Sequence, residues 1–189
     1  IWGCRLYQRG AYEVQDLGSQ WIAQVAGAFG RPILDYCAGR GGKSLALWLS
    51  ILDEPKPDDV LLHDPDASRL KAAVGRFSRT GLDRPKTVSS PSALCESSFG
   101  TVLVDAPCSQ SGILRRHPGL RWRIPPDSFE TNGGLQLSIL QEASRFVRPN
   151  GVLVYATCSL STQENDDVVM RFLETESGFT ICESAKAMG

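Results

Sequence analysis

The chain has 189 residues, of which 42% are hydrophobic and 22% charged, a composition that excludes a disordered or fibrous protein. Twenty lysines and arginines stand against twenty-one acidic residues, so the net charge of −1 provides no overall basic field for holding a polyanion. A chain of this length can form one sizeable core without disulfides or a structural metal. We expect a single domain over residues 1–189, as a fragment of a longer protein.

The sequence shows neither a run of about 18 apolar residues nor the charged-then-apolar order of a signal peptide, so we expect no membrane segment. Six cysteines occur without a C-x-x-C pair and beside only two histidines, so no metal site is expected. Reduced thiols indicate a cytoplasmic protein, with a nucleolus or organelle left open, and we expect a monomer. Cys4, Cys95 and Cys182 lie outside any motif and are expected to be small buried apolar side chains.

The first predicted elements are a helix, a strand and a second helix. Residues 16–29 carry apolar side chains at helical spacing, which predicts an amphipathic helix with these side chains on its buried face. The face consists of Leu17, Trp21, Ile22, Val25 and Phe29. A strand follows at 33–36, and after a glycine cluster a helix is expected over 43–52.

The remaining elements continue the alternation of strands with helices. Gly81 is expected to end the helix over 66–79 in a left-handed conformation. Ser161 to Glu164 form a capping-box pattern that opens the last helix, and this pattern by itself accounts for Glu164. The strands and the other helix are expected at 60–63 (strand), 86–88 (weak strand), 101–104 (buried strand), 134–147 (helix), 152–155 (buried strand) and 179–182 (strand).

This alternation predicts a doubly wound α/β fold with a mostly parallel sheet. Ligands of such sheets bind outside the carboxyl ends of the strands. With the usual strand order 3-2-1-4-5, the fourth and fifth strands are neighbours. Cys108 and Cys158, which follow these two strands, should then converge on one cleft beside the glycine loop.

The segment DYCAGRGGK (35–43) places a glycine-rich turn between a strand and a helix, where backbone N–H groups can meet a ligand. A phosphate-binding P-loop needs glycine where Cys37 stands, and the dinucleotide fingerprint needs glycine where Ser44 stands. We interpret the loop as a site for a nucleoside-bearing cofactor, with Asp64 accepting hydrogen bonds from ribose hydroxyls. A plain structural turn, with Asp64 as a turn or N-cap residue, is the alternative.

Three segments in this order and spacing resemble one family: DYCAGRGGK (35–43), VDAPCSQSG (104–112) and YATCSLSTQEN (155–165). The family is the RsmB/NOP (Sun/Fmu-type) family of S-adenosylmethionine-dependent RNA cytosine-5 methyltransferases. YEVQDLGSQ (12–20) is similar to its entry segment. The resemblance covers nearly the whole chain. It implies the Rossmann-like class I methyltransferase fold without its last strand, and S-adenosyl-L-methionine as cofactor.

The implied chemistry needs two thiols. Carbon 5 of cytosine is too weak a nucleophile to take a methyl group directly, so a thiolate first adds to carbon 6. By resemblance Cys158 is this nucleophile and Cys108 assists product release. Asp105 would lie against the cytosine ring near the methyl donor, and Lys43 would lower a thiol pKa or neutralise the substrate. The implied cofactor residues are Cys37, Ala38, Gly39, Arg40, Gly41, Gly42, Lys43, Asp64, Arg69 and Asp105.

The loop 113–123 combines basic and aromatic side chains, which favours contact with phosphates and bases. We expect RNA binding here, to rRNA rather than tRNA, although a solvated charged loop is the alternative. The basic residues are Arg115, Arg116, Arg121 and Arg123.

Two other functions compete with RNA cytosine methylation. A DNA cytosine-5 methyltransferase would also use a Pro-Cys nucleophile, but it would not need Cys158. An RNA-binding or ribosome-assembly scaffold that has lost catalysis would fit the departures from the family pattern. These departures are Arg40 in place of a proline, and Ser89, Ser90 and Ser92 where the family has an acid that contacts adenine.

Overall fold

The computed structural model describes residues 3–51, 56, 58–125 and 127–182. Its contacts group the chain into two compact units, Ile1–Asp105 with Ala143–Ala156, and Ala106–Glu142 with Thr157–Gly189. The elements are α1 (Arg5–Gln8), α2 (Leu17–Gly27), β1 (Ile33–Asp35), α3 (Gly42–Ser50), β2 (Val60–His63), α4 (Ala67–Arg79), β3 (Lys86–Val88), β4 (Phe99–Asp105), α5 (Ser128–Ser144), β5 (Val147–Ala156) and α6 (Asp166–Thr175). Short 3₁₀ helices are η1 (Pro91–Ala93), η2 (Ser111–Ile113), η3 (Pro118–Trp122) and η4 (Thr162–Glu164).

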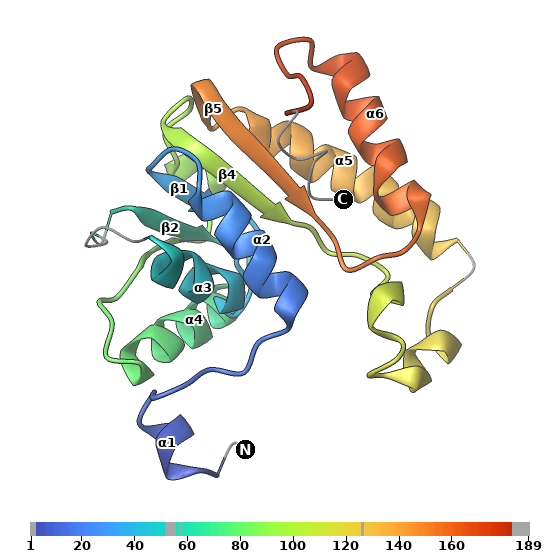
Figure 1. Cartoon of the computed structure of the whole chain (residues 1–189). Coiled ribbons are helices and arrows are strands. Elements are labelled where there is room, and N and C mark those ends of the chain that lie inside the picture. The colour runs from blue at the N-terminus through green and yellow to red at the C-terminus, as the bar shows by residue number, and fades with distance from the viewer. Residues whose placement is uncertain (1–2, 52–55, 57, 126, 183–189) are drawn as a thin grey trace. The chain divides into compact units, whose positions relative to one another are not determined.

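The first unit contains a five-stranded sheet in the order β3-β2-β1-β4-β5, with every pair parallel (Figure 1). This confirms the predicted α/β class and strand order. β1 is the central strand, and its Ile33 pairs with Val60 on one side and Thr101 on the other. All three residues of β1 are buried, as expected of a strand covered on both faces.

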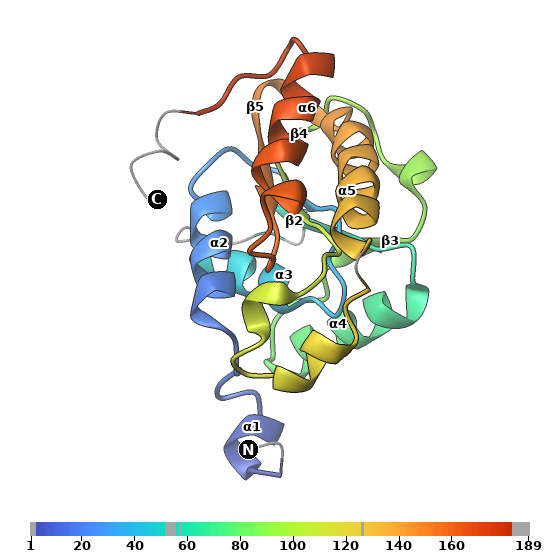
Figure 2. The same cartoon turned by 90° about the vertical axis from the view of Figure 1, so that its right-hand side faces the viewer.

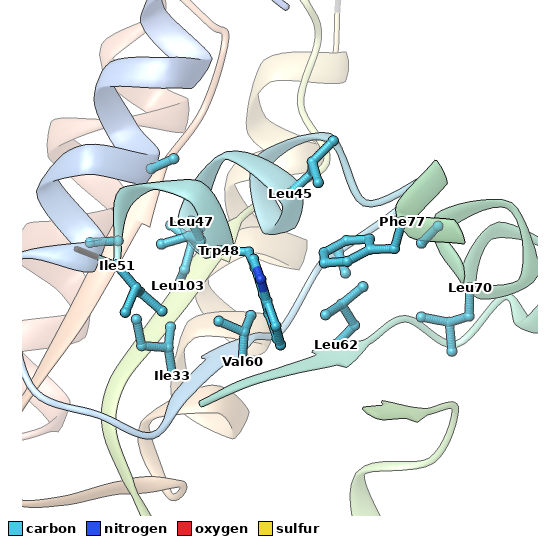
Figure 3. Close-up of a cluster of buried hydrophobic side chains, with 14 residues drawn as sticks. Ile33, Leu45, Leu47, Trp48, Ile51, Val60, Leu62, Leu70, Phe77 and Leu103 are labelled. Carbon is cyan, nitrogen blue, oxygen red and sulfur yellow. The ribbon is translucent and has the colours of Figure 1, made fainter. Parts of the chain in front are cut away.

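One apolar core joins α3, α4 and the sheet (Figure 3). The indole of Trp48 on α3 meets the ring of Phe77 on α4 edge to face, with 5.8 Å between centroids. Leu45 of α3 and Leu62 of β2 complete this contact, and all four side chains are buried. The core therefore fixes both ends of the loop between β1 and α3.

The buried face of α2 differs from the prediction. Leu17 and Trp21 are 79% and 49% exposed, whereas Ala23 and Ala26 are fully buried. α2 packs closely on α3 (Figure 2), and a Cβ at Gly27 would lie 2.3 Å from Ser50 Oγ. Small side chains are needed at this close approach, and Leu17 and Trp21 lie elsewhere on the helix. Ile22, also predicted on the buried face, packs against the core.

Several predicted boundaries also change. α5 begins and ends earlier than the predicted 134–147, and α3 begins at Gly42; Leu52, part of the predicted helix, lies outside the described residues. β5 begins five residues early because a register shift accommodates its Pro-Asn-Gly segment. The predicted strand at 179–182 is wrong: this segment is irregular, and the Phe179 ring packs on Phe172 of α6. Gly81 has φ +74° where α4 ends, as predicted.

Three cysteines expected in the core, Cys4, Cys95 and Cys182, are exposed instead. The capping box is only half formed. The Ser161 side chain accepts the Gln163 N–H, but α6 itself starts at Asp166, after η4. Within the described part of the chain, no helix is long and apolar enough to cross a membrane.

Candidate functional site

The glycine loop between β1 and α3 is anchored at both ends by backbone hydrogen bonds. The Ala38 N–H donates to the His63 carbonyl (2.9 Å), and the Gly41 N–H closes a turn onto Ala38 O (2.9 Å). Gly41 has φ +72°, and a Cβ there would lie 2.7 Å from Ala73 Cβ. Gly39 also has a positive φ, but a Cβ there would meet nothing within 4 Å. The space beside the Gly39 Cα is therefore unfilled by the described residues.

Asp64 lies at the end of β2 and holds this loop in place. Its Oδ2 accepts the Gly39 N–H (2.9 Å) and its Oδ1 accepts the Asp66 N–H (2.9 Å). The residue is only 3% exposed. The N-cap of α4 is Asp66, whose side chain accepts the Ser68 N–H (2.8 Å), so Asp64 is not an N-cap. Its bond to the Asp66 N–H, two residues on, is instead the side-chain turn contact that the structural alternative expects.

Two further carboxylates belong to the same unit. Asp35 is 1% exposed, and the Ser44 hydroxyl donates to its Oδ2 (2.6 Å). The pKa of Asp35 is raised to about 7, chiefly by burial and also by the negative charges of Asp105 and Asp64, while the Ser44 hydrogen bond and the charge of Lys43 oppose the rise. Lys43 Nζ donates to Asp105 Oδ2 (2.6 Å). The acidic residues Asp35, Asp64 and Asp105 outnumber the single lysine, Lys43. This arrangement suits a ligand that carries positive charge.

Asp35 makes stability depend on pH. Its raised pKa means that the folded state keeps a proton that the unfolded state releases, so its contribution is full below pH 3.8 and is lost as pH rises through 7. We expect the free energy of unfolding to fall between pH 5 and pH 8 by about 3 kcal/mol more in the wild type than in Asp35→Asn. Urea unfolding at both pH values measures this, with the exposed Asp83→Asn as control. An equal pH dependence in wild type and Asp35→Asn would contradict it.

The other predicted cofactor residues lie around the same loop. Burial raises the pKa of Cys37, and nearby carboxylates add to this, so its thiol stays protonated. Ala38 is buried, Arg40 is exposed and Gly42 begins α3. Arg69 is largely exposed and lies 3.4 Å from Asp66 and 3.9 Å from Asp64.

The second unit brings the two predicted thiols together. Cys108 Sγ and Cys158 Sγ are 3.1 Å apart, which confirms that the segments after β4 and β5 converge here. The hydrogen bond from Cys158 lowers the pKa of Cys108 to about 7, against the opposing effect of burial. One negative charge can therefore reside on the sulfur pair near neutral pH.

Hydrogen bonds from backbone N–H groups hold the two thiol-bearing segments together. The Gly112 N–H donates to the Cys158 carbonyl (2.8 Å), and a Cβ at Gly112 would lie 2.5 Å from that oxygen. The Leu160 N–H donates to Ser111 Oγ (2.9 Å). The segments that carry Cys108 and Cys158 can therefore approach this closely only with glycine at position 112.

Sequence reasoning missed the role of Glu164, because the capping-box pattern accounts for it locally. Its carboxylate is fully buried and accepts hydrogen bonds from Ser109 and Ser159, the residues that follow the two cysteines. Burial raises its pKa, but the bonds from Ser109, Ser159 and Asn132 outweigh burial and lower it, so Glu164 is ionised at neutral pH. No local pattern could reveal this, because most of the donors lie far from Glu164 in sequence.

The four arginines of the basic loop lie toward the surface, as does the exposed Trp122 (82%). The Arg121 guanidinium lies 5.2 Å from the Trp122 ring centroid, within cation–π range. Arg116, His117 and Arg123 help to line an open hollow of about 460 Å³, to which Arg115 and Arg121 do not contribute. Among the residues that the structure describes, no group of three or more His, Cys, Asp or Glu side chains could hold a metal ion.

Comparison with known families decides the relationship. The model of the family described as 16S rRNA methyltransferase RsmB/F matches residues 24–187. The chain belongs to this RsmB/F family. Ribosomal RNA small subunit methyltransferase B of Shewanella oneidensis is 36% identical over 174 residues, covering 89% of this chain and 40% of the relative. The protein of the same name from Pasteurella multocida is 36% identical over 179 residues, covering 88% and 39%.

Solved structures share the fold. NSun6 from Pyrococcus horikoshii, solved with SFG, has a TM-score of 0.80 at 24% identity, covering 93% of this chain and 45% of that one. A methyltransferase homolog from the same organism has a TM-score of 0.73 at 25% identity, covering 92% and 55%. The RsmB/F chain thus has the Rossmann-like methyltransferase fold, and it spans about 40% of the length of the curated relatives it matches.

Proposed function

We propose that this RsmB/F chain carries the catalytic machinery of an S-adenosylmethionine-dependent methyltransferase that modifies carbon 5 of cytosine in rRNA. The observation that carries the proposal is the pair of thiols 3.1 Å apart, one of them with a pKa lowered to about 7. Relatives named as small-subunit rRNA methyltransferases support rRNA, rather than tRNA, as the substrate. We further propose that it acts as a monomer in the cytoplasm.

The acids of the first unit fit the cofactor. S-adenosylmethionine carries a sulfonium and an ammonium group, which suit a site with Asp35, Asp64 and Asp105 around Lys43. Asp35 Oδ1 is buried and has no hydrogen-bond partner among the described residues. The unfilled space beside the Gly39 Cα leaves room for the ligand. SFG, the ligand of the NSun6 structure, is an analogue of S-adenosylmethionine.

The thiols would perform the covalent chemistry. The cofactor supplies the methyl group when it is bound. The Cys158 thiolate forms a bond to carbon 6, and the displaced electron pair makes carbon 5 nucleophilic enough to accept the methyl group. After transfer, carbon 5 gives its proton to a base and the electron pair of that C–H bond forms the double bond between carbons 5 and 6. The bond from Cys158 to carbon 6 then breaks, and its electron pair stays on the sulfur as a thiolate. Cys108 would assist this last stage as an acid–base group.

Asp105 and Lys43 would have supporting roles. We propose that Asp105 orients the cytosine ring beside the methyl donor. Because Lys43 already pairs with Asp105, it would hold this carboxylate in place. The lowered pKa of Cys108 arises first from Cys158 and then from backbone N–H groups. Lowering of a thiol pKa by Lys43 stays a prediction.

Methyl incorporation tests the reaction directly. Radiolabelled S-adenosylmethionine is incubated with the protein and either unmodified 16S rRNA or duplex DNA, and the product nucleosides are separated. We expect label only in RNA, as 5-methylcytidine. Label in duplex DNA would favour the DNA methyltransferase alternative, and label at another RNA position would contradict the chemistry proposed for the thiols.

The basic loop should govern RNA affinity. Replacing Arg115, Arg116, Arg121 and Arg123 by Gln removes four positive charges from a surface loop. We expect weaker RNA binding and a smaller dependence of the binding constant on salt, with the logarithmic slope reduced by up to about 3 to 4. Filter binding from 50 to 300 mM salt measures the slope. Replacing Arg5 and Arg9, on and next to α1, by Gln is the control, and an equal effect there would argue against a specific role for the loop.

A further inference from the structure

The carboxylate of Glu164 is the meeting point of a buried hydrogen-bond network in the second unit. Oε1 accepts the Ser109 N–H (2.8 Å), Asn132 Nδ2 (3.0 Å) and Gln136 Nε2 (3.1 Å). Oε2 accepts the hydroxyls of Ser109 and Ser159, each at 2.5 Å. A fully buried, ionised carboxylate is costly without such donors, so the network depends on all of them.

Two of these donors are the immediate neighbours of the thiols. Ser109 follows Cys108, and Ser159 follows Cys158. Because both hydroxyls donate to the same oxygen, the carboxylate bridges the two segments one residue beyond each sulfur. The hydroxyls also lie 3.3 Å apart, so the bridge is compact.

The remaining donors fix the carboxylate itself. Asn132 and Gln136 lie one turn apart on α5, and Gln136 Nε2 also donates to the Pro107 carbonyl (2.8 Å). α5 reaches η4 closely enough because residue 133 is glycine, where a Cβ would lie 2.5 Å from Gln163 O. Glu164 is therefore held from α5 while it holds both thiol segments.

We propose that Glu164 is a positioning residue that sets the separation of Cys108 and Cys158. This inference rests on the function proposed for the thiols. It adds a role for Glu164, which accepts hydrogen bonds from the residues that follow the two cysteines. In the absence of the carboxylate, the two serine hydroxyls lose their common acceptor. The hydrogen bonds donated by the Gly112 and Leu160 N–H groups would remain, but they do not involve Asn132 or Gln136.

The test measures thiol proximity without RNA or cofactor. The reduced protein is equilibrated with mixtures of reduced and oxidised glutathione. Cys108 and Cys158 each lose a proton and an electron to form one disulfide, while one oxidised glutathione becomes two reduced molecules. Quenching, alkylation and mass spectrometry of peptides then give the equilibrium constant for the Cys108–Cys158 disulfide in wild type, Glu164→Ala and Glu164→Gln.

We expect Glu164→Ala to lower this constant at least tenfold. Glu164→Gln should restore most of it, because its oxygen can accept the three N–H donors while its NH₂ donates to the two hydroxyls, which rotate to accept. Ser159→Ala, which removes one arm of the bridge, should have an intermediate effect and carries the test if Glu164→Ala does not fold. The proposal would be overturned if folded Glu164→Ala had the same disulfide equilibrium constant as the wild type. If only Ser159→Ala folds, a wild-type disulfide constant in that variant would overturn it.

Kinetics separate this role from the proposed function itself. In an active preparation, Glu164→Ala should lower kcat for methylation tenfold or more with little change in KM for RNA, and Glu164→Gln should recover kcat. A wild-type protein that forms the disulfide readily but methylates no RNA would contradict the proposed function and leave the positioning role standing. A change confined to KM, with an unaltered disulfide constant, would contradict the positioning role alone.

Discussion

Cys158→Ala should abolish methylation, with a loss of at least about a thousandfold, because the variant lacks the nucleophile that adds to carbon 6. Cys158→Ser should behave in the same way, since a hydroxyl is not ionised near neutral pH. Incorporation of labelled methyl groups into rRNA measures both. Cys95→Ala, which changes an exposed cysteine outside the motifs, is the matched control and should retain activity.

Cys108→Ala should have a different effect: a covalent complex between protein and RNA should accumulate, because release is impaired while addition continues. A complex that survives denaturing electrophoresis reports this, and the double variant that also carries Cys158→Ala should show none. Full activity in Cys158→Ala would refute the assignment of the nucleophile. A covalent complex in that single variant would instead identify Cys108, whose pKa is lowered to about 7, as the attacking thiol.

Asp64→Ala should weaken binding of S-adenosylmethionine by about one hundredfold. Two hydrogen bonds from ribose hydroxyls to a carboxylate contribute about 3 kcal/mol, and each factor of ten corresponds to about 1.4 kcal/mol. The substitution also removes the acceptor of the Gly39 N–H, which disorders the loop on which the ligand would rest. Calorimetric titration with the cofactor and with its demethylated product measures the loss.

Two variants control this experiment. Asp64→Asn keeps an acceptor oxygen but places an NH₂ group against one of two backbone N–H donors, so an intermediate loss is expected. Asp66→Asn keeps the N-cap of α4 and should bind like the wild type. Wild-type affinity in Asp64→Ala would place the cofactor elsewhere. A folded wild-type protein without saturable binding would favour the catalytically inactive scaffold.

Much of the fold could be predicted because the information is local. Apolar strands between helical patterns determine the parallel sheet, and the order of strands follows from the usual winding of such sheets. The convergence of Cys108 and Cys158 was predictable for the same reason, since each follows the end of one of two neighbouring strands. The segments that carry the glycine loop and both thiols also indicate the family, because its motifs are short and contiguous in the chain.

The errors have a common physical cause in contacts between distant segments. The pattern of α2 wrongly placed Leu17 and Trp21 on its buried face, because close packing on α3 selects alanine and glycine there. Glu164 satisfied a local helix-start pattern, although its hydrogen-bond partners include side chains of α5 and of the segment after β4. Phe179 has strand-forming neighbours, but its ring packs on α6.

If the glycine loop binds the cofactor as proposed, the packing of Gly41 against Ala73 would couple cofactor affinity to α4. A ligand that needs the ordered loop binds with an apparent dissociation constant equal to the intrinsic one divided by the fraction of molecules in which the loop is ordered. Suppose that a larger side chain in place of Ala73 left the glycine loop ordered in about one molecule in ten. The affinity for the cofactor would then fall about tenfold, although no residue that contacts the ligand had changed. By linkage, bound cofactor would favour the packed state of α4 to the same extent.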